Sequence, residues 1–167
     1  MTDTATVEAK MVVEIQHVAA QPTAAVHLRR SAARVPDAFG EYLPRIGAKV
    51  GRLGGQFCGP PFLIYHGILD GELDIELGMP VSHPVVGLPE LARIGLDSVG
   101  TSDLPAGRVA KWIYRGPYSG LGQGWNQFNA WLIEHDYSVD GTTWESYLDS
   151  PDSVSAEELR TVFYIRI

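Results

Sequence analysis

Residues 142–148 read TTWESYL, and their aromatic and β-branched side chains, bounded by glycine and proline turns, predict a strand. Side chains alternate along a strand, so Glu145 and Tyr147 share one face and Trp144 lies on the other. A carboxylate is a poor strand former. It therefore belongs either to a solvated face, the commoner case, or to a cavity that favours a negative charge. These residues alone leave both interpretations open.

The composition is that of one soluble globular domain: 167 residues, 45% apolar and 20% charged. A formal net charge of −7 argues against a nucleic-acid surface. The single cysteine excludes an intrachain disulfide, and the five histidines show no metal-ligand spacing. Residues 1–10 are polar and predict a disordered tail rather than a signal peptide. No apolar run has the length of a membrane span, so we expect a cytoplasmic protein.

The first half of the chain predicts a strand, a helix and two further strands. Residues 11–18 indicate a strand, which Gln21-Pro22 interrupts before residues 24–28 continue the extended path. Apolar residues three and four apart predict a helix over residues 35–53. Pro44 lies inside this helical pattern and is expected to kink or divide it. Strands follow at residues 62–65 and 72–81. The second of these alternates apolar residues with three acids, which we expect on a solvated face: Glu72, Asp74 and Glu76.

The second half repeats this order after a connection over residues 83–106, which contains one edge strand near residues 92–99. A strand at 108–114, a helix from 121 to 135, and strands at 142–148 and 159–167 follow. The sequence therefore predicts an α+β fold with two βαββ repeats. Repeat one spans about 11–82 and repeat two spans 107–167, within one domain over 11–167.

Five short motifs occur in a fixed order on this pattern. The motifs are Gly59-Pro60-Pro61 with Tyr65, Leu104-Pro105-Ala106-Gly107, Arg115-Gly116-Pro117-Tyr118, Trp144-Glu145-Ser146-Tyr147, and Glu158-Leu159. In that order they resemble the GyrI-like family, which comprises effector-binding domains of multidrug-sensing transcription regulators and stand-alone relatives such as the DNA gyrase inhibitor protein. The resemblance covers nearly the whole chain.

The resemblance implies two βαββ units related by a pseudo-twofold axis, with an antiparallel sheet, two helices and a ligand cleft between the units. The glutamate of the family's E-x-Y motif, which lies in the cleft of members that bind cationic aromatic drugs, is matched by Glu145. Its counterpart in the first repeat is Leu63, so the charge is expected on one side only. Trp125 and Trp131 are expected in the core or at the surface. The expected ligand-binding residues are Glu145, Tyr147, Tyr65, Tyr118, Trp112, Tyr114 and Leu63.

Three functions remain open on these residues. The first is a stand-alone protein that binds hydrophobic, cationic aromatic molecules, because a carboxylate among aromatic faces attracts a delocalised cation. The second, implied by the resemblance, is a hydrolase of cyclopropane-containing genotoxic natural products, with Glu145 as the catalytic base and Tyr65 or Tyr147 beside it. The third is a protein-interaction module of the gyrase-inhibitor kind. We expect no helix-turn-helix region before the domain, and no cofactor, metal, nucleic-acid or membrane partner.

Overall fold

The computed structural model describes residues 11–167, so the expected tail at residues 1–10 lies outside the described part of the chain. The eight strands form one antiparallel sheet in the order β1-β6-β8-β7-β3-β4-β2-β5, and two helices accompany it. The predicted α+β class is therefore confirmed. The strands are β1 (Glu14–Val18), β2 (Gln21–Arg30), β3 (Phe62–Leu69), β4 (Glu72–Pro80), β5 (Val99–Leu104), β6 (Gly107–Arg115), β7 (Thr143–Tyr147) and β8 (Arg160–Arg166).

Two βαββ units make up most of this sheet. The first is β2-α1-β3-β4, with α1 at Val35–Arg52, and the second is β6-α2-β7-β8, with α2 at Leu121–Glu134. The units join where β3 pairs with β7, and in that pairing Leu63 lies directly opposite Glu145. The two positions matched between the predicted repeats are therefore neighbours at the centre of the sheet.

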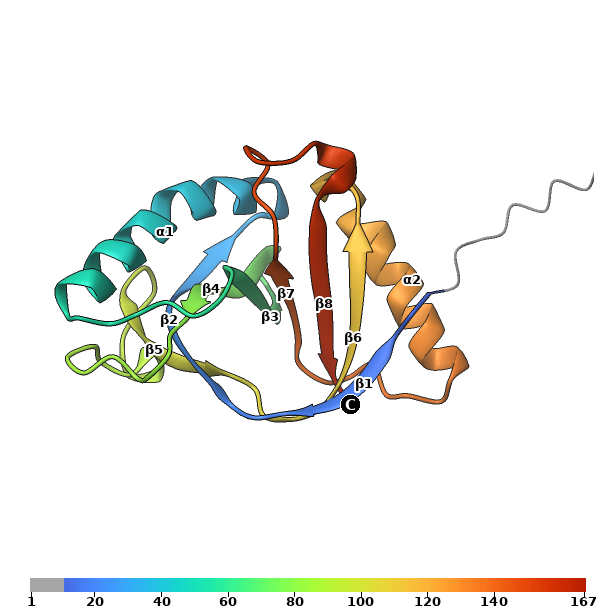
Figure 1. The fold of residues 1–167 in the computed structure, drawn as a ribbon, viewed down its shortest axis with the longest axis horizontal. Helices are drawn as coiled ribbons and strands as arrows, with labels where there is room; N and C mark the ends of the chain where they lie inside the picture. Colours follow the sequence, from blue (N-terminus) through green and yellow to red (C-terminus); the bar gives the residue numbers. More distant parts are fainter. Residues whose placement is uncertain (1–10) are drawn as a thin grey trace, which may run out of the picture.

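The sheet is curled, and two strand pairs, β1–β6 and β2–β5, form the curled part. Strand β1 pairs with β6 and β2 pairs with β5, so the connections β1–β2 and β5–β6 run together beneath the central strands (Figure 1). Here the sequence prediction needs correction. Residues 11–30 form two strands that pair with different partners, and the edge strand begins at Val99 instead of spanning residues 92–99.

Pro44 does not divide α1, which was one of the two outcomes expected from the sequence. The helix runs through it without interruption for 18 residues. A proline removes the hydrogen bond to the carbonyl four residues earlier, here that of Gly40. Both Gly40 and Pro44 are exposed, so water can satisfy that carbonyl. The buried side of the helix, with Tyr42 and Ile46, is unaffected.

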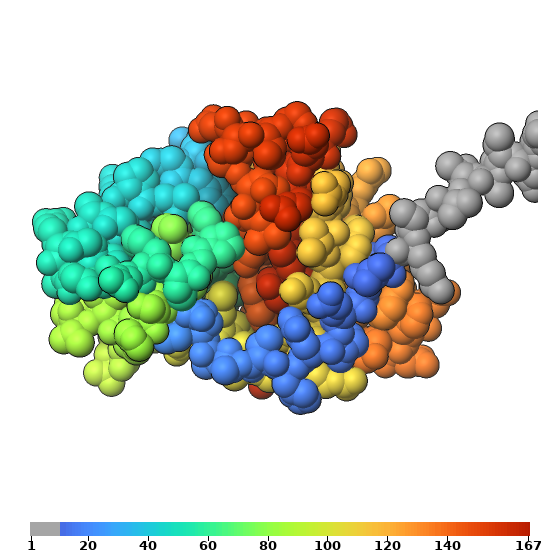
Figure 2. Space-filling view, in the orientation of Figure 1, coloured from blue at the N-terminus to red at the C-terminus, as the bar shows by residue number. Residues whose placement is uncertain are grey.

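The helices cover one face of the sheet at its two ends (Figure 1). Helix α1 packs on β2, β3 and β4, and α2 packs on β6 and β8. The opposite, concave face of the sheet carries a third apolar cluster, which contains Trp144 and Phe62. In Figure 2 the segment after β7, in red, lies against the start of α1, in blue. Among residues 11–167 no helix is long and apolar enough to cross a membrane.

The acidic face predicted for β4 is only partly solvated. Glu72 is exposed, but Glu76 is 6% exposed and Asp74 is half-buried. Each of the latter two contacts a histidine: Glu76 contacts His66 and Asp74 contacts His27. The prediction was wrong here because strand alternation shows which residues share a face but not what packs over that face.

Candidate functional site

Glu145 lies on the helix-facing side of β7, between two apolar neighbours on the adjoining strands. Its partners across the sheet are Leu63 on β3 and Phe163 on β8, and both are fully buried. The glutamate itself is 1% exposed. Strand pairing thus fixes a carboxyl group in an environment that offers little solvation, and such a group requires hydrogen-bond donors.

Three donors meet the Glu145 carboxylate. Tyr65 Oη and Trp125 Nε1 donate to Oε1 at 3.0 and 2.6 Å, and Tyr147 Oη donates to Oε2 at 2.5 Å. Tyr65 and Tyr147 lie on strands β3 and β7, whereas Trp125 lies on helix α2, which packs over the sheet. Together they occupy three of the roughly four acceptor positions of a carboxylate.

Burial raises the pKa of Glu145 above its ordinary value, and the three hydrogen bonds partly oppose that rise. Burial also raises the pKa values of Tyr65 and Tyr147, with the neighbouring Glu145 charge as the next cause. Both phenols therefore stay protonated and remain donors. No cationic side chain among residues 11–167 contributes to the pKa of Glu145, so its ionised form carries an uncompensated negative charge.

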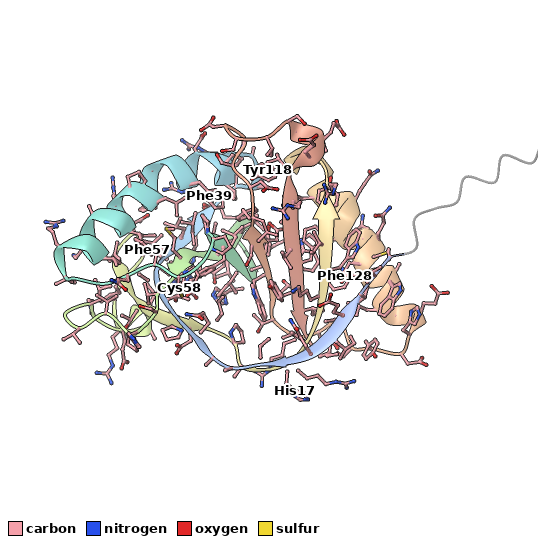
Figure 3. All side chains as sticks on the ribbon, in the orientation of Figure 1. His17, Phe39, Phe57, Cys58, Tyr118 and Phe128 are labelled. Carbon is pink, nitrogen blue, oxygen red and sulfur yellow. The ribbon has the colours of Figure 1, made fainter. Side chains whose placement is uncertain are left out.

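A cavity of about 760 Å³ opens above this carboxylate. Its size suits a drug-sized organic molecule, and most of its lining is apolar or aromatic. Phe39 on α1 and Tyr118 before α2, both labelled in Figure 3, line the cavity, and both make edge contacts with the Tyr147 ring, at 5.2 and 5.8 Å between centroids. The other lining residues are Ala32, Val35, Pro36, Leu43, Pro60, Pro61, Tyr65, Leu73, Leu121, Leu148, Asp149, Ser150 and Pro151.

Glu145 and Asp149 are the two acids of the cavity lining, and they differ in their partners. Arg160 holds Asp149 through two side-chain hydrogen bonds of 2.9 and 3.0 Å, which lower the pKa of Asp149 and neutralise its charge. Glu145 has only neutral donors. The cavity therefore offers a single uncompensated acid, set at its floor.

The structure brings four of the seven expected ligand-binding residues to the cavity: Glu145, Tyr147, Tyr65 and Tyr118. The other three lie elsewhere. Trp112 and Tyr114 pack beneath α2 against Phe163, and Leu63 is buried under α1 beside Glu145 without lining the cavity.

Trp125 was missed as a site residue by the sequence analysis, which expected it in the core or at the surface. Its ring does stack on Phe163, with centroids 4.5 Å apart, but its indole N–H reaches Glu145. The available signal was chemical, because a tryptophan on a buried helix face needs an acceptor for its N–H. Glu145 is the buried acid beneath that face.

Solved structures with the same fold are numerous but distant in sequence. The crystal structure of the EcmrR C-terminal domain is 18% identical with a TM-score of 0.75, and the match covers 94% of this chain and 97% of that domain. The match to EcmrR in its complex with DNA has 17% identity and a TM-score of 0.72, and the present chain covers only 58% of that longer EcmrR chain.

Two further structures share the fold. A hydrolase from Listeria innocua is 15% identical with a TM-score of 0.61, covering 93% of this chain and 91% of that one. SAV2435 bound to tetraphenylphosphonium is 11% identical with a TM-score of 0.55, covering 93% of both chains. At these identities the likeness shows the fold alone.

No curated protein sequence matches the chain significantly. A family model does match it, over residues 11–167, which is nearly its whole length. The family resemblance drawn from the five motifs is thus confirmed. The chain belongs to the family of GyrI-like small molecule binding domains.

Proposed function

We propose that this domain binds hydrophobic, cationic aromatic molecules in the cavity above Glu145. The observation that carries the proposal is the uncompensated carboxylate of Glu145 at the floor of an otherwise apolar, aromatic-walled cavity. A delocalised cation gains attraction from the carboxylate and from the ring faces around it without a fixed hydrogen-bond pattern. Binding of tetraphenylphosphonium by SAV2435, which shares the fold, supports this class of ligand.

The three donors on Glu145 favour bulky cations without N–H groups. Tyr65, Tyr147 and Trp125 already occupy most of the carboxylate's acceptor positions. A protonated amine would have to displace one of them to form its own hydrogen bond, whereas a phosphonium or quaternary ammonium needs only the field of the charge.

The direct test is a titration of the purified protein with tetraphenylphosphonium and with neutral triphenylphosphine oxide. At about 0.3 kcal/mol per heavy atom, the phosphonium, with about 25 heavy atoms, should bind with a Kd on the order of micromolar. The neutral compound has about five heavy atoms fewer, which alone predicts about tenfold weaker binding. It also gains nothing from the carboxylate, so it should bind at least about 100-fold more weakly than the phosphonium. A difference of about tenfold or less, measured by calorimetry, would contradict the proposal.

Cation affinity should also depend on pH through Glu145. The ionised carboxylate attracts the cation and the protonated one does not, so affinity is full above the pKa of Glu145 and falls as pH drops through it. Burial raises that pKa, so the fall should begin at a higher pH than for an exposed glutamate. The facing phenols stay protonated and Asp149 stays ionised, so neither masks the effect.

Calorimetry between about pH 8 and pH 5 measures this dependence. Near the pKa, cation binding should release a proton, which appears as a dependence of the binding heat on the buffer. Triphenylphosphine oxide provides the control, since its affinity should stay constant. A cation affinity that is constant over the same range would show that Glu145 is not the group that attracts the ligand.

Hydrolysis is the second candidate, and one observation favours it. A carboxyl group whose pKa is raised by burial, with a phenol 2.5 Å away, is suited to accept a proton from water. However, Tyr65 and Tyr147 both donate to Glu145, so neither can stabilise a developing oxyanion without first breaking that bond. The resting geometry therefore favours binding. Slow conversion of a cyclopropane-containing substrate that is lost in Glu145→Gln would establish the hydrolase instead.

A further inference from the structure

A second polar cluster lies on the face of the sheet turned away from the cavity. It consists of His27 on β2, His66 on β3, and Asp74 and Glu76 on β4. A β-bulge between Tyr65 and Gly67 sets the position of His66, because the extra residue in β3 re-aims its side chain. The cluster plays no part in the proposed cavity chemistry.

Each imidazole of this cluster donates to its own carboxylate. His66 Nε2 lies 3.1 Å from Glu76 Oε2, and His27 Nε2 contacts Asp74 Oδ1. An ionised carboxylate can only accept, so the proton of each neutral ring sits on Nε2. Each Nδ1 is then left with a free lone pair, and among residues 11–167 neither Nδ1 has a hydrogen-bond partner.

The two rings are close enough to act together. Their centroids are 6.1 Å apart and the rings are nearly perpendicular, at 81°. The His27 and His66 side chains are 33% and 39% exposed, so an ion can reach both from solvent. Asp74 and Glu76 lie deeper and place two negative charges behind the rings.

From this geometry we infer that His27 and His66 form a divalent metal site, with their Nδ1 atoms as ligands and Asp74 and Glu76 as supporting carboxylates. A ligating histidine commonly donates its other N–H to a carboxylate, which fixes the ring and raises its basicity. Here both rings show that arrangement. Zinc and copper(II) are the ions that imidazole nitrogen suits best among common divalent metals.

The site has two protein ligands, and waters complete the coordination. Among residues 11–167 no group of three or more histidine, cysteine, aspartate or glutamate side chains is placed to hold a metal, so the proposed coordination rests on the two imidazoles and on water alone. Glu76 also keeps one buried oxygen, Oε1, without a hydrogen-bond partner in the described chain. A dication nearby would offset this poorly solvated charge.

Titration of the protein with zinc chloride at about pH 8 tests the site. We expect one zinc ion per chain. Asp74→Asn and Glu76→Gln should each weaken binding by about 10- to 100-fold, the usual cost of losing a supporting carboxylate. His27→Ala and His66→Ala should weaken it at least as much, because each removes a ligand.

Copper(II) electron paramagnetic resonance provides a readout that a purely structural role would not change. The wild-type spectrum should show coupling to two imidazole nitrogens, and each single histidine variant should show one. Two matched controls should keep wild-type zinc affinity: His17→Ala, an exposed histidine on β1 (Figure 3), and Glu145→Gln, in the cavity on the other face.

The inference is overturned if no saturable zinc binding occurs, or if the His27→Ala/His66→Ala double variant binds zinc as the wild type does. Circular dichroism of each variant separates a lost site from a lost fold. The outcome is independent of the cavity proposal, because the organic cation and the zinc ion are titrated separately and Glu145→Gln affects only the former.

Discussion

Glu145→Gln should lower the affinity for tetraphenylphosphonium by about 100-fold. A bound cation about 6 Å from the carboxylate would interact with it by about 3 kcal/mol at an effective dielectric constant of about 20, and 1.4 kcal/mol corresponds to a factor of ten. The glutamine keeps the size and shape of the side chain, so the apolar walls of the cavity stay in place. Isothermal titration of wild type and variant with the same cation measures the difference.

A surface variant with the same change in net charge is the matched control. The Glu90 side chain is 65% exposed and forms an ion pair with Arg93 on the surface. Glu90→Gln should change cation affinity by less than about twofold, because solvent and salt screen a surface charge. If Glu145→Gln and Glu90→Gln have equal effects, the charge at the cavity floor does not drive binding. Triphenylphosphine oxide should bind all three proteins alike.

The fold could be predicted from sequence largely because both repeats carry clear periodic patterns. Apolar residues at helical spacing predicted α1 and α2, and the alternation of side chains along the strand predicted which residues around Glu145 share a face of β7. What escaped prediction depends on long-range pairing. Whether residues 11–30 form one strand or two is decided by pairing with β6 and β5, whose paired residues lie 73 to 97 positions further along the chain.

The candidate site was predictable where one strand face determines it. Glu145 and Tyr147 are two residues apart on β7, so their shared face follows from the sequence. Trp112 and Tyr114 also share a face, but both faces of β6 carry apolar side chains, and alternation cannot say which face adjoins a cavity. Whether Trp125 faces Glu145 depends on the rotation of α2 about its axis, and that rotation is determined by packing against the sheet.

The histidine cluster shows the same limit more strongly. His27 and Asp74 are 47 residues apart, and His66 reaches Glu76 only because β3 carries a bulge. No ligand spacing within one element marks such a site. The strand pairings β2–β4 and β3–β4 create it.

Phe163→Ala should produce the largest loss of stability among these variants, about 3–5 kcal/mol in the free energy of unfolding. Phe163 is fully buried on β8, and its ring stacks between those of Trp125 and Tyr114, with centroids 4.5 and 5.6 Å away. Truncation removes the contacts of both rings and leaves a cavity under α2. Urea unfolding should show a lower midpoint with an unchanged slope.

Ile113→Ala is the control, because Ile113 is 46% exposed on the other face of neighbouring β6. It should cost about 1 kcal/mol or less. If Phe163→Ala costs no more unfolding free energy than Ile113→Ala, the ring stack does not fix α2 on the sheet.

The stack also positions the Trp125 N–H over Glu145. The milder Phe163→Leu should therefore keep the fold while it weakens the hydrogen bond to the carboxylate, and the pH at which cation affinity falls should then shift upward.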